Sequence, residues 1–254
     1  MSYESYLRVP ELLSLQDLLS DPPAHDELLF IVIHQVYELW FKDVLRELES
    51  ARALVADGDI GRGIHLLQRV HTIERVLIEQ VSVLETMSPQ DFLEFRTRLA
   101  PASGFQSVQF REIEFISGLK DEVYLTRLGS EVGVARLIRR AEEPTLWDSF
   151  CAHLESRGLP MPAGDETGRR RSLVTVASER SSYGDEFALS EALLTHDELF
   201  SLWRLRHVLM VERQIGSKAG TGGSTGASYL RTTLDKRFYP ELWALRSYLS
   251  DPPA

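Results

Sequence analysis

The chain has 254 residues, of which 43% are hydrophobic and 26% charged, and its 28 Lys+Arg and 38 Asp+Glu give a net charge of −10. These are the proportions of a globular protein long enough to bury a core without disulfides, and with Cys151 as the single cysteine no intramolecular disulfide can form. The acidic balance disfavours nucleic-acid binding, and no apolar run approaches the roughly 20 residues that a membrane span needs. Without a basic and apolar leader in its first residues, the protein is expected in the cytoplasm.

Helical periodicity dominates the first half of the chain. Pro22 and Pro23 break the chain before the first long helix, and Asp59 can cap the second. Ser88 and Pro89 form a strong start for a third helix, because they supply a hydroxyl cap and a proline in the first turn. The helices are predicted over about 25–56, 59–87, 88–101 and 104–116.

The second half of the chain is less uniform. A helix is predicted around 145–156, and a polar, turn-rich stretch follows it. Helical pattern resumes over about 189–215, a glycine-rich segment follows, and a last helix is expected over 240–249. We therefore predict an all-α fold, in one domain over residues 1–254, with a surface insert around 143–186.

His34 lies in the first long helix, directly after six apolar residues that begin at Leu28. Burial favours a neutral imidazole, which then needs a hydrogen-bond partner. Phe30 lies one turn before it and Glu38 one turn after it, on the same face. On composition alone, a core histidine bonded to a neighbouring group is a better interpretation than a catalytic one.

His207 lies on an apolar helical stripe, with Trp203 one turn before it and Val211 one turn after it. Such an imidazole can be an axial ligand to haem iron, but more often it is simply buried. No HExxH or CxxC motif occurs, and no two histidines are four residues apart. A metal site made by one helix is therefore not expected.

The glycine-rich segment contains GTGGSTG, from Gly220 to Gly226. It lacks the GK[ST] ending of a phosphate-binding loop, and it follows a helix rather than a strand, so it does not predict a nucleotide site. It is either a plain linker or a loop whose amides and hydroxyls, including that of Thr221, close over a polar ligand. The sequence does not decide between the two.

Arg96 emerges from an apolar helix face, between Phe92 and Leu99. A buried guanidinium needs an anion. That anion is either an acidic side chain such as Glu94 or Glu112, or the carboxylate of a substrate held through two hydrogen bonds.

Five blocks of the sequence, in order, resemble the tryptophan 2,3-dioxygenase family. They are YESYLRV from Tyr3, DELLFIVIHQVYELWFK from Asp26, DFLEFRTRLAPASGFQSVQFR from Asp91, WRLRHVLMVERQIGSKAGTGGSTGASYLR from Trp203 and FYPELWALRSYL from Phe238. The segment 142–185 has no recognisable counterpart. The resemblance implies a helical bundle that encloses a haem pocket, with the N-terminal segments intertwined in a homo-oligomer, a tetramer built as a dimer of dimers.

The resemblance also assigns roles to the residues singled out above. His207 corresponds to the axial ligand of haem b, and His34 to the distal histidine that orients the indole N–H, with general-base catalysis possible. Arg96 corresponds to the partner of the substrate carboxylate, and Thr221 to a threonine that binds the amino and carboxylate groups. The remaining implied positions are the indole-pocket residues Phe30, Phe92 and Leu99, the haem-cavity residues Trp203, Ser103 and Gly104, of which Ser103 also lines the substrate cavity, and Tyr3 and Tyr6, which would reach a neighbouring subunit's site.

The activity implied by the resemblance is the opening of the indole 2,3 bond of L-tryptophan by O2, to give N-formyl-L-kynurenine in the first step of the kynurenine pathway. One alternative is a related haem enzyme of secondary metabolism that acts on a substituted tryptophan or inserts a single oxygen atom. Discrimination by one methyl group is worth only about 1–3 kcal/mol, so a small change in the pocket would be enough to change the preferred substrate. Two others are a non-catalytic haem-binding protein and a purely structural helical scaffold.

Overall fold

The computed structural model describes residues 1–102, 104–127, 131–222 and 225–249. Within these residues every regular element is helical, which confirms the predicted all-α class. In chain order the elements are α1 (Tyr3–Leu7), α2 (Val9–Leu12), α3 (His25–Ala56), α4 (Ile60–Leu84), α5 (Pro89–Arg96), the 3₁₀ turns η1 (Thr97–Leu99) and η2 (Gly104–Gln106), α6 (Val108–Ser117), α7 (Val123–Arg127), α8 (Glu131–Glu142), α9 (Leu146–Ser156), α10 (Glu166–Ser178), α11 (Arg180–Ile215), α12 (Ala227–Arg231), α13 (Pro240–Leu245) and η3 (Arg246–Tyr248).

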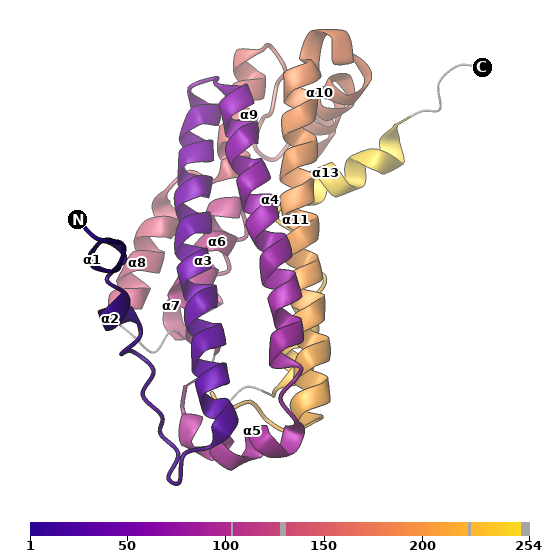
Figure 1. The fold of residues 1–254 in the computed structure, drawn as a ribbon. Coiled ribbons are helices and arrows are strands. Elements are labelled where there is room, and N and C mark those ends of the chain that lie inside the picture. The colour runs from indigo at the N-terminus through magenta and orange to yellow at the C-terminus, as the bar shows by residue number, and fades with distance from the viewer. Residues whose placement is uncertain (103, 128–130, 223–224, 250–254) are drawn as a thin grey trace.

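Three long helices, α3, α4 and α11, lie side by side and form the body of the molecule (Figure 1). Helix α5 crosses one end of this bundle, and α6 and α9 pack against α3. Leucines of all three long helices, among them Leu48, Leu67 and Leu193, are fully buried between them. Burial of each such side chain stabilises the fold by about 1.5–3 kcal/mol, so the apolar faces of these helices hold the bundle together.

The predicted starts of the second and third helices are confirmed where the sequence supplied a cap, whereas α4 ends at Leu84 and α5 at Arg96, before the predicted ends at 87 and 101. The Asp59 side chain accepts from the Arg62 amide at the start of α4. Ser88 and Asp91 form a reciprocal capping box at the start of α5. At the start of α3 the buried Glu27 carboxylate accepts from the amides of Leu19 and Ser20, at 2.7 and 3.0 Å, and thereby ties the N-terminal segment to the bundle. An acid is favourable there because the helix N-terminus is electropositive.

The segment 143–186 differs from the surface insert predicted for it. Helix α9 packs on α3, and α10 packs on α11 and α13. Phe150 of α9 and Leu173 of α10 are almost completely buried. Three consecutive arginines, 169–171, precede the apolar positions of α10 and hide its amphipathic pattern in the sequence. The segment is therefore part of the packed fold, and α11 begins at Arg180, with a kink at Tyr183, rather than near Leu189.

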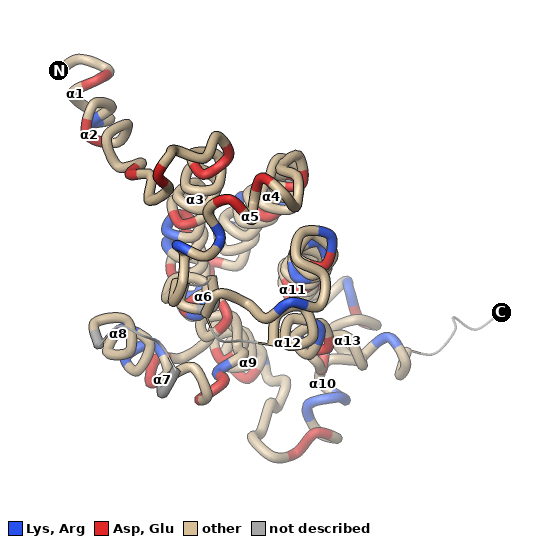
Figure 2. The backbone as a smooth tube through the Cα atoms, turned by 90° about the horizontal axis from the view of Figure 1, so that it is seen from below, with Lys and Arg blue, Asp and Glu red and all other residues tan. Residues whose placement is uncertain are grey.

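The N-terminal helices α1 and α2 extend away from the bundle, as Figure 2 shows from the α5 end. None of the residues in these two helices is buried, and the side chains of Tyr3 and Tyr6 are 76% and 71% exposed. Among the described residues, no helix is long and apolar enough to cross a membrane.

Candidate active site

His34 is held in one orientation by the helix that carries it. Its Nδ1 atom lies 2.7 Å from the carbonyl oxygen of Phe30, one turn earlier in α3, and its ring lies against the Phe30 ring with 4.1 Å between centroids. A carbonyl only accepts, so Nδ1 carries the proton. Burial lowers the pKa of His34. The neutral ring therefore keeps a lone pair on Nε2, which can accept a hydrogen bond from a ligand N–H group.

An aromatic wall adjoins His34. The ring centroids of Phe30 and Phe92 are 5.8 Å apart, and Phe95 contacts both rings edge-on at 5.6 and 5.4 Å. Leu99, in the turn after α5, is partly buried against the same core. Phe95 was missed in the sequence, although its place three residues after Phe92 is the signal that puts both on one helix face. This wall suits a flat aromatic ligand.

His207 belongs to α11, and the Trp203 ring one turn earlier stacks on it, with 5.1 Å between centroids and 20° between planes. Burial lowers the pKa of His207 to about 4, and the charge of Arg111, like a proton on His34, acts in the same direction. The imidazole is thus neutral near pH 7. No group in the described part of the chain hydrogen-bonds to its ring, so its nitrogen lone pair is available to a metal.

Arg96 and the glycine loop meet at the end of α5. The Arg96 guanidinium donates to the carbonyl oxygen of Ala219, and Thr221 Oγ1 donates to the carbonyl oxygen of Ala102 at 2.7 Å. Within residues 1–102, 104–127, 131–222 and 225–249, no carboxylate forms an ion pair with Arg96, and Glu112, one of the two candidates, is paired with Arg136 and Arg140 of α8. The loop is therefore fastened to the α5–α6 connection by two groups that could instead bind a polar ligand.

Gly226 shows why the end of this loop needs glycine. Its φ is +69°, a conformation that residues with a side chain rarely adopt. A Cβ atom added there would lie 2.4 Å from the carbonyl oxygen of Lys218. The chain can therefore turn toward α12 only because residue 226 has no side chain. This turn determines how the loop passes Arg96.

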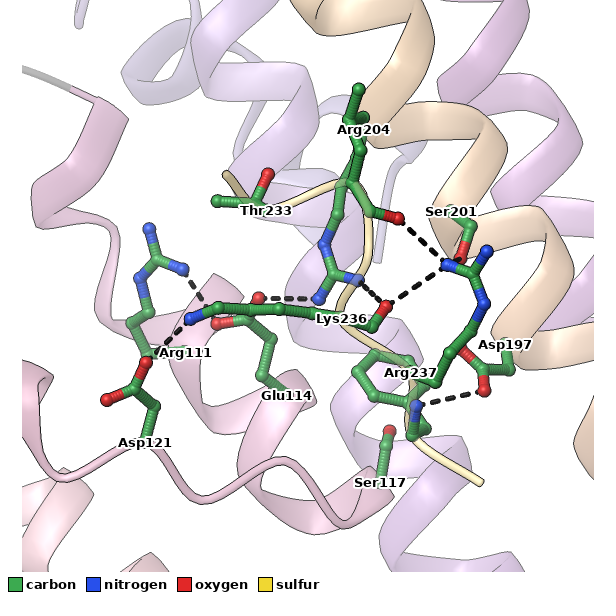
Figure 3. Close-up of polar contacts among 12 residues, drawn as sticks. Arg111, Glu114, Ser117, Asp121, Asp197, Ser201, Arg204, Thr233, Lys236 and Arg237 are labelled. Carbon is green, nitrogen blue, oxygen red and sulfur yellow. Dashed lines mark hydrogen bonds and ion pairs between the residues drawn. The ribbon is translucent and has the colours of Figure 1, made fainter. Parts of the chain in front are cut away.

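A buried ion cluster fixes α11, and with it His207, against α6 (Figure 3). The two oxygens of Glu114 accept from Arg111 and from Arg204, each at 2.7 Å. The three residues are 1%, 6% and 3% exposed, in that order. Arg204 also donates to the backbone of Lys236 at 3.0 Å, so the cluster joins α6, α11 and the segment that follows α12.

The structure does not bring every predicted residue to this site. Tyr3 and Tyr6 lie on the exposed α1, which extends away from the bundle (Figure 2). Gly104 opens the turn η2, and no heavy atom lies within 4 Å of the place where a Cβ would stand. Ser103 lies outside the described residues. Glu38, on the same face as His34, accepts from Gln109 Nε2 at 2.8 Å.

Comparison with known proteins places this arrangement in a family. A family model described as tryptophan 2,3-dioxygenase matches residues 1–158 and 166–249, so most of the segment 142–185, which the sequence alone left unmatched, also belongs to the family pattern. Relatives named tryptophan 2,3-dioxygenase include one from Nocardioides sp. (58% identity, covering 98% of this chain and 95% of the relative), one from Herpetosiphon aurantiacus (46%, covering 98% of both) and one from Myxococcus xanthus (40%, 99% and 91%). The chain therefore belongs to the tryptophan 2,3-dioxygenase family, a family of haem dioxygenases.

Proposed function

We propose that this protein binds haem b through His207 and uses O2 to open the indole 2,3 bond of L-tryptophan, giving N-formyl-L-kynurenine. The observation that carries the proposal is the pairing of two neutral histidines. His34 of α3 has a free acceptor nitrogen, and His207 of α11 has no hydrogen-bond partner among the described groups. The two rings are close enough that a proton on His34 would lower the pKa of His207.

The residues around His207 fit a haem group. A neutral, buried imidazole is the usual axial ligand of haem iron, and the stacked Trp203 ring restricts the rotation of the His207 ring. The neighbouring rings of Phe110 and Phe200 lie 5.1 and 6.3 Å from Trp203 and keep this side apolar. When bound, haem would supply the activation of O2 and the oxidation chemistry.

The protein's own groups would bind and orient the substrate. His34 Nε2 would accept the indole N–H, while Phe30 and Phe92 lie against the ring. Arg96 and Thr221 would release the carbonyl oxygens of Ala219 and Ala102 and bind the substrate carboxylate and amino groups. An ionised acceptor makes stronger hydrogen bonds than a carbonyl oxygen, so the exchange is favourable. The glycine loop would then cover the substrate and exclude water.

The exposed N-terminal segment supports a homo-oligomer. Beyond Tyr3 and Tyr6, large apolar side chains such as Leu13 and Leu15 are exposed between α1 and α3. An apolar segment of this kind marks a protein contact. We propose a tetramer, built as a dimer of dimers, in which this segment places both tyrosines at a neighbouring subunit's site.

The haem assignment can be tested with His207→Gly. We expect the variant to lose the Soret absorbance of bound haem and to recover it when imidazole is added, because the free base can occupy the space that the side chain leaves. His65→Ala is the control, since His65 is an exposed histidine of α4. Unchanged haem content in His207→Gly without imidazole would contradict the assignment.

A further inference from the structure

The plane of the His207 ring is not set by a hydrogen bond within the described part of the chain. A histidine that binds a metal commonly donates its second N–H group to a carbonyl or carboxylate oxygen, and this bond fixes the orientation of the ring. Burial and nearby charges act on His207, but no such acceptor is found among the described groups. The Trp203 ring, which stacks on His207 with 5.1 Å between centroids and 20° between planes, can fix this orientation instead.

Trp203 is itself in contact with Tyr37, a buried residue of α3. The two rings meet edge to face, with 6.0 Å between centroids and 78° between planes. Among the rings that contact Trp203 in the described part of the chain, only that of Tyr37 carries a hydroxyl group, since the others belong to Phe110, Phe200 and His207. Tyr37 can therefore hold the indole by a polar contact as well as by packing.

The Tyr37 hydroxyl is ready to accept a hydrogen bond. Its own hydrogen is already used, because it donates to the carbonyl oxygen of Leu77 in α4 at 2.9 Å. A phenol has one hydrogen to donate, so the lone pairs that remain on the oxygen can only accept. Tyr37 thus joins α3 to α4 and keeps an acceptor in the interior of the bundle.

Trp203 Nε1 is the donor that interacts with this oxygen. Burial raises the pKa of Tyr37 to about 12, and the hydrogen bond from Trp203 acts in the opposite direction, as expected of a donor that stabilises the phenolate. Nε1 is buried, and no acceptor in the described chain meets it at ordinary hydrogen-bond geometry, so the contact with Tyr37 is a long one. A buried indole N–H usually finds a partner, and the Tyr37 oxygen is the one that it acts on.

We propose that Tyr37 is a positioning residue for His207: its hydroxyl accepts a long hydrogen bond from Trp203 Nε1 and so fixes the indole plane on which the imidazole stacks. The contact ties α3, α4 and α11 together beside His207. Tyr37 also follows His34 by three residues, so the same stretch of α3 orients both histidines of the site. The effect on the iron rests on the proposed haem function, whereas the contact between Tyr37 and Trp203 does not.

The contact can be tested by ultraviolet resonance Raman spectroscopy of the full-length protein, excited in the indole absorption. The difference between the wild type and Trp203→Phe isolates the Trp203 bands, including one that reports hydrogen bonding of the indole N–H. We expect a weakly hydrogen-bonded N–H, and the same difference taken in a Tyr37→Phe background should show the band moved to the position of a free N–H. The difference for Trp243→Phe is the reference for a short hydrogen bond, because Trp243 Nε1 donates to Asp197 Oδ2 at 2.9 Å.

The matched control is Tyr239→Phe. It also removes one buried tyrosine hydroxyl and keeps the ring, and the ring contacts of Tyr239 in the described chain do not include Trp203. A free Trp203 N–H in the wild type, or a Trp203 band that stays in place in Tyr37→Phe, would overturn the proposal. If Tyr37→Phe fails to fold, the wild-type spectrum still decides whether the N–H is hydrogen-bonded.

The positioning role has its own readout in the haem-loaded, ferrous protein. Tyr37→Phe keeps the ring beside Trp203 but removes the acceptor, so we expect the iron–histidine stretching band to shift and broaden in this variant and to stay in place in Tyr239→Phe. An unshifted band in Tyr37→Phe would refute the positioning role. Because the indole spectra do not require haem, failure of the contact and failure of the haem assignment give different results.

Discussion

Glu114 is the group on which the placement of α11 depends most directly, and Glu114→Gln tests this. The substitution keeps the size of the side chain but removes its negative charge. Arg111 and Arg204 would then remain buried beside a neutral amide, whose single oxygen can accept from only one of them as it did before.

The expected loss can be sized from the burial of the cluster. All three side chains are at least 90% buried, so solvent does not screen the charges that remain. Breaking a buried ion pair by removing one partner destabilises a protein by about 3–5 kcal/mol. For a domain of this size, 1 kcal/mol corresponds to about 2–4 °C in Tm, so we expect Tm to fall by roughly 6–20 °C.

The assay is thermal and urea unfolding of the wild type, Glu114→Gln and Glu212→Gln. Glu212 is the matched control, because it pairs with Arg231 at 2.6 Å on the surface, where the arginine side chain is 60% exposed. Its loss should cost no more than about 1 kcal/mol. If Glu114→Gln is destabilised by as little as Glu212→Gln, the buried cluster does not hold α11 and the reasoning is wrong.

Two further predictions concern histidines. His34→Ala should retain haem but lose about 0.5–1.5 kcal/mol of transition-state binding, because an uncharged hydrogen bond is removed. This loss corresponds to a fall of roughly 2- to 13-fold in kcat/KM for L-tryptophan, measured by steady-state kinetics. An unchanged kcat/KM would contradict the role given to His34. His71 donates to the carbonyl oxygen of Ala192 at 2.9 Å, and burial lowers its pKa from 6.5 to about 4. The unfolded chain takes up this proton as the pH falls from 6.5 to 4 while the folded chain does not, so the free energy of unfolding should fall by about 3 kcal/mol across that window. Urea unfolding at several pH values should show a shallower fall in His71→Gln, and an equal slope in both proteins would count against a neutral His71.

The fold was predictable where local signals acted alone. Helix α3 has the predicted bounds, 25–56, because an apolar face and a following glycine fix its length. Helix α7 was not predicted, and neither was α8, although its sequence is strongly amphipathic; α10 was taken for part of a surface insert because its arginines dilute its periodicity. Their pairing with α6, α11 and α13 depends on contacts between residues far apart in the sequence, which periodicity does not encode.

The candidate site, too, was predictable only where local signals acted alone. The contacts of His34 with Phe30, and of His207 with Trp203, follow from helical spacing of four residues and could be predicted. That α3, α5 and α11 bring these pairs together came only from the resemblance to a family. The contact between Tyr37 and Trp203 was missed, because it joins residues far apart in the sequence, which helical spacing does not relate.

The central claim is tested most directly by the mass of the product. The reduced, haem-loaded protein is held without oxygen with L-tryptophan, and ¹⁸O-labelled O2 is then admitted. The account predicts a product heavier than tryptophan by two labelled oxygen atoms. A product that gains one labelled atom, or no product from L-tryptophan, would contradict it.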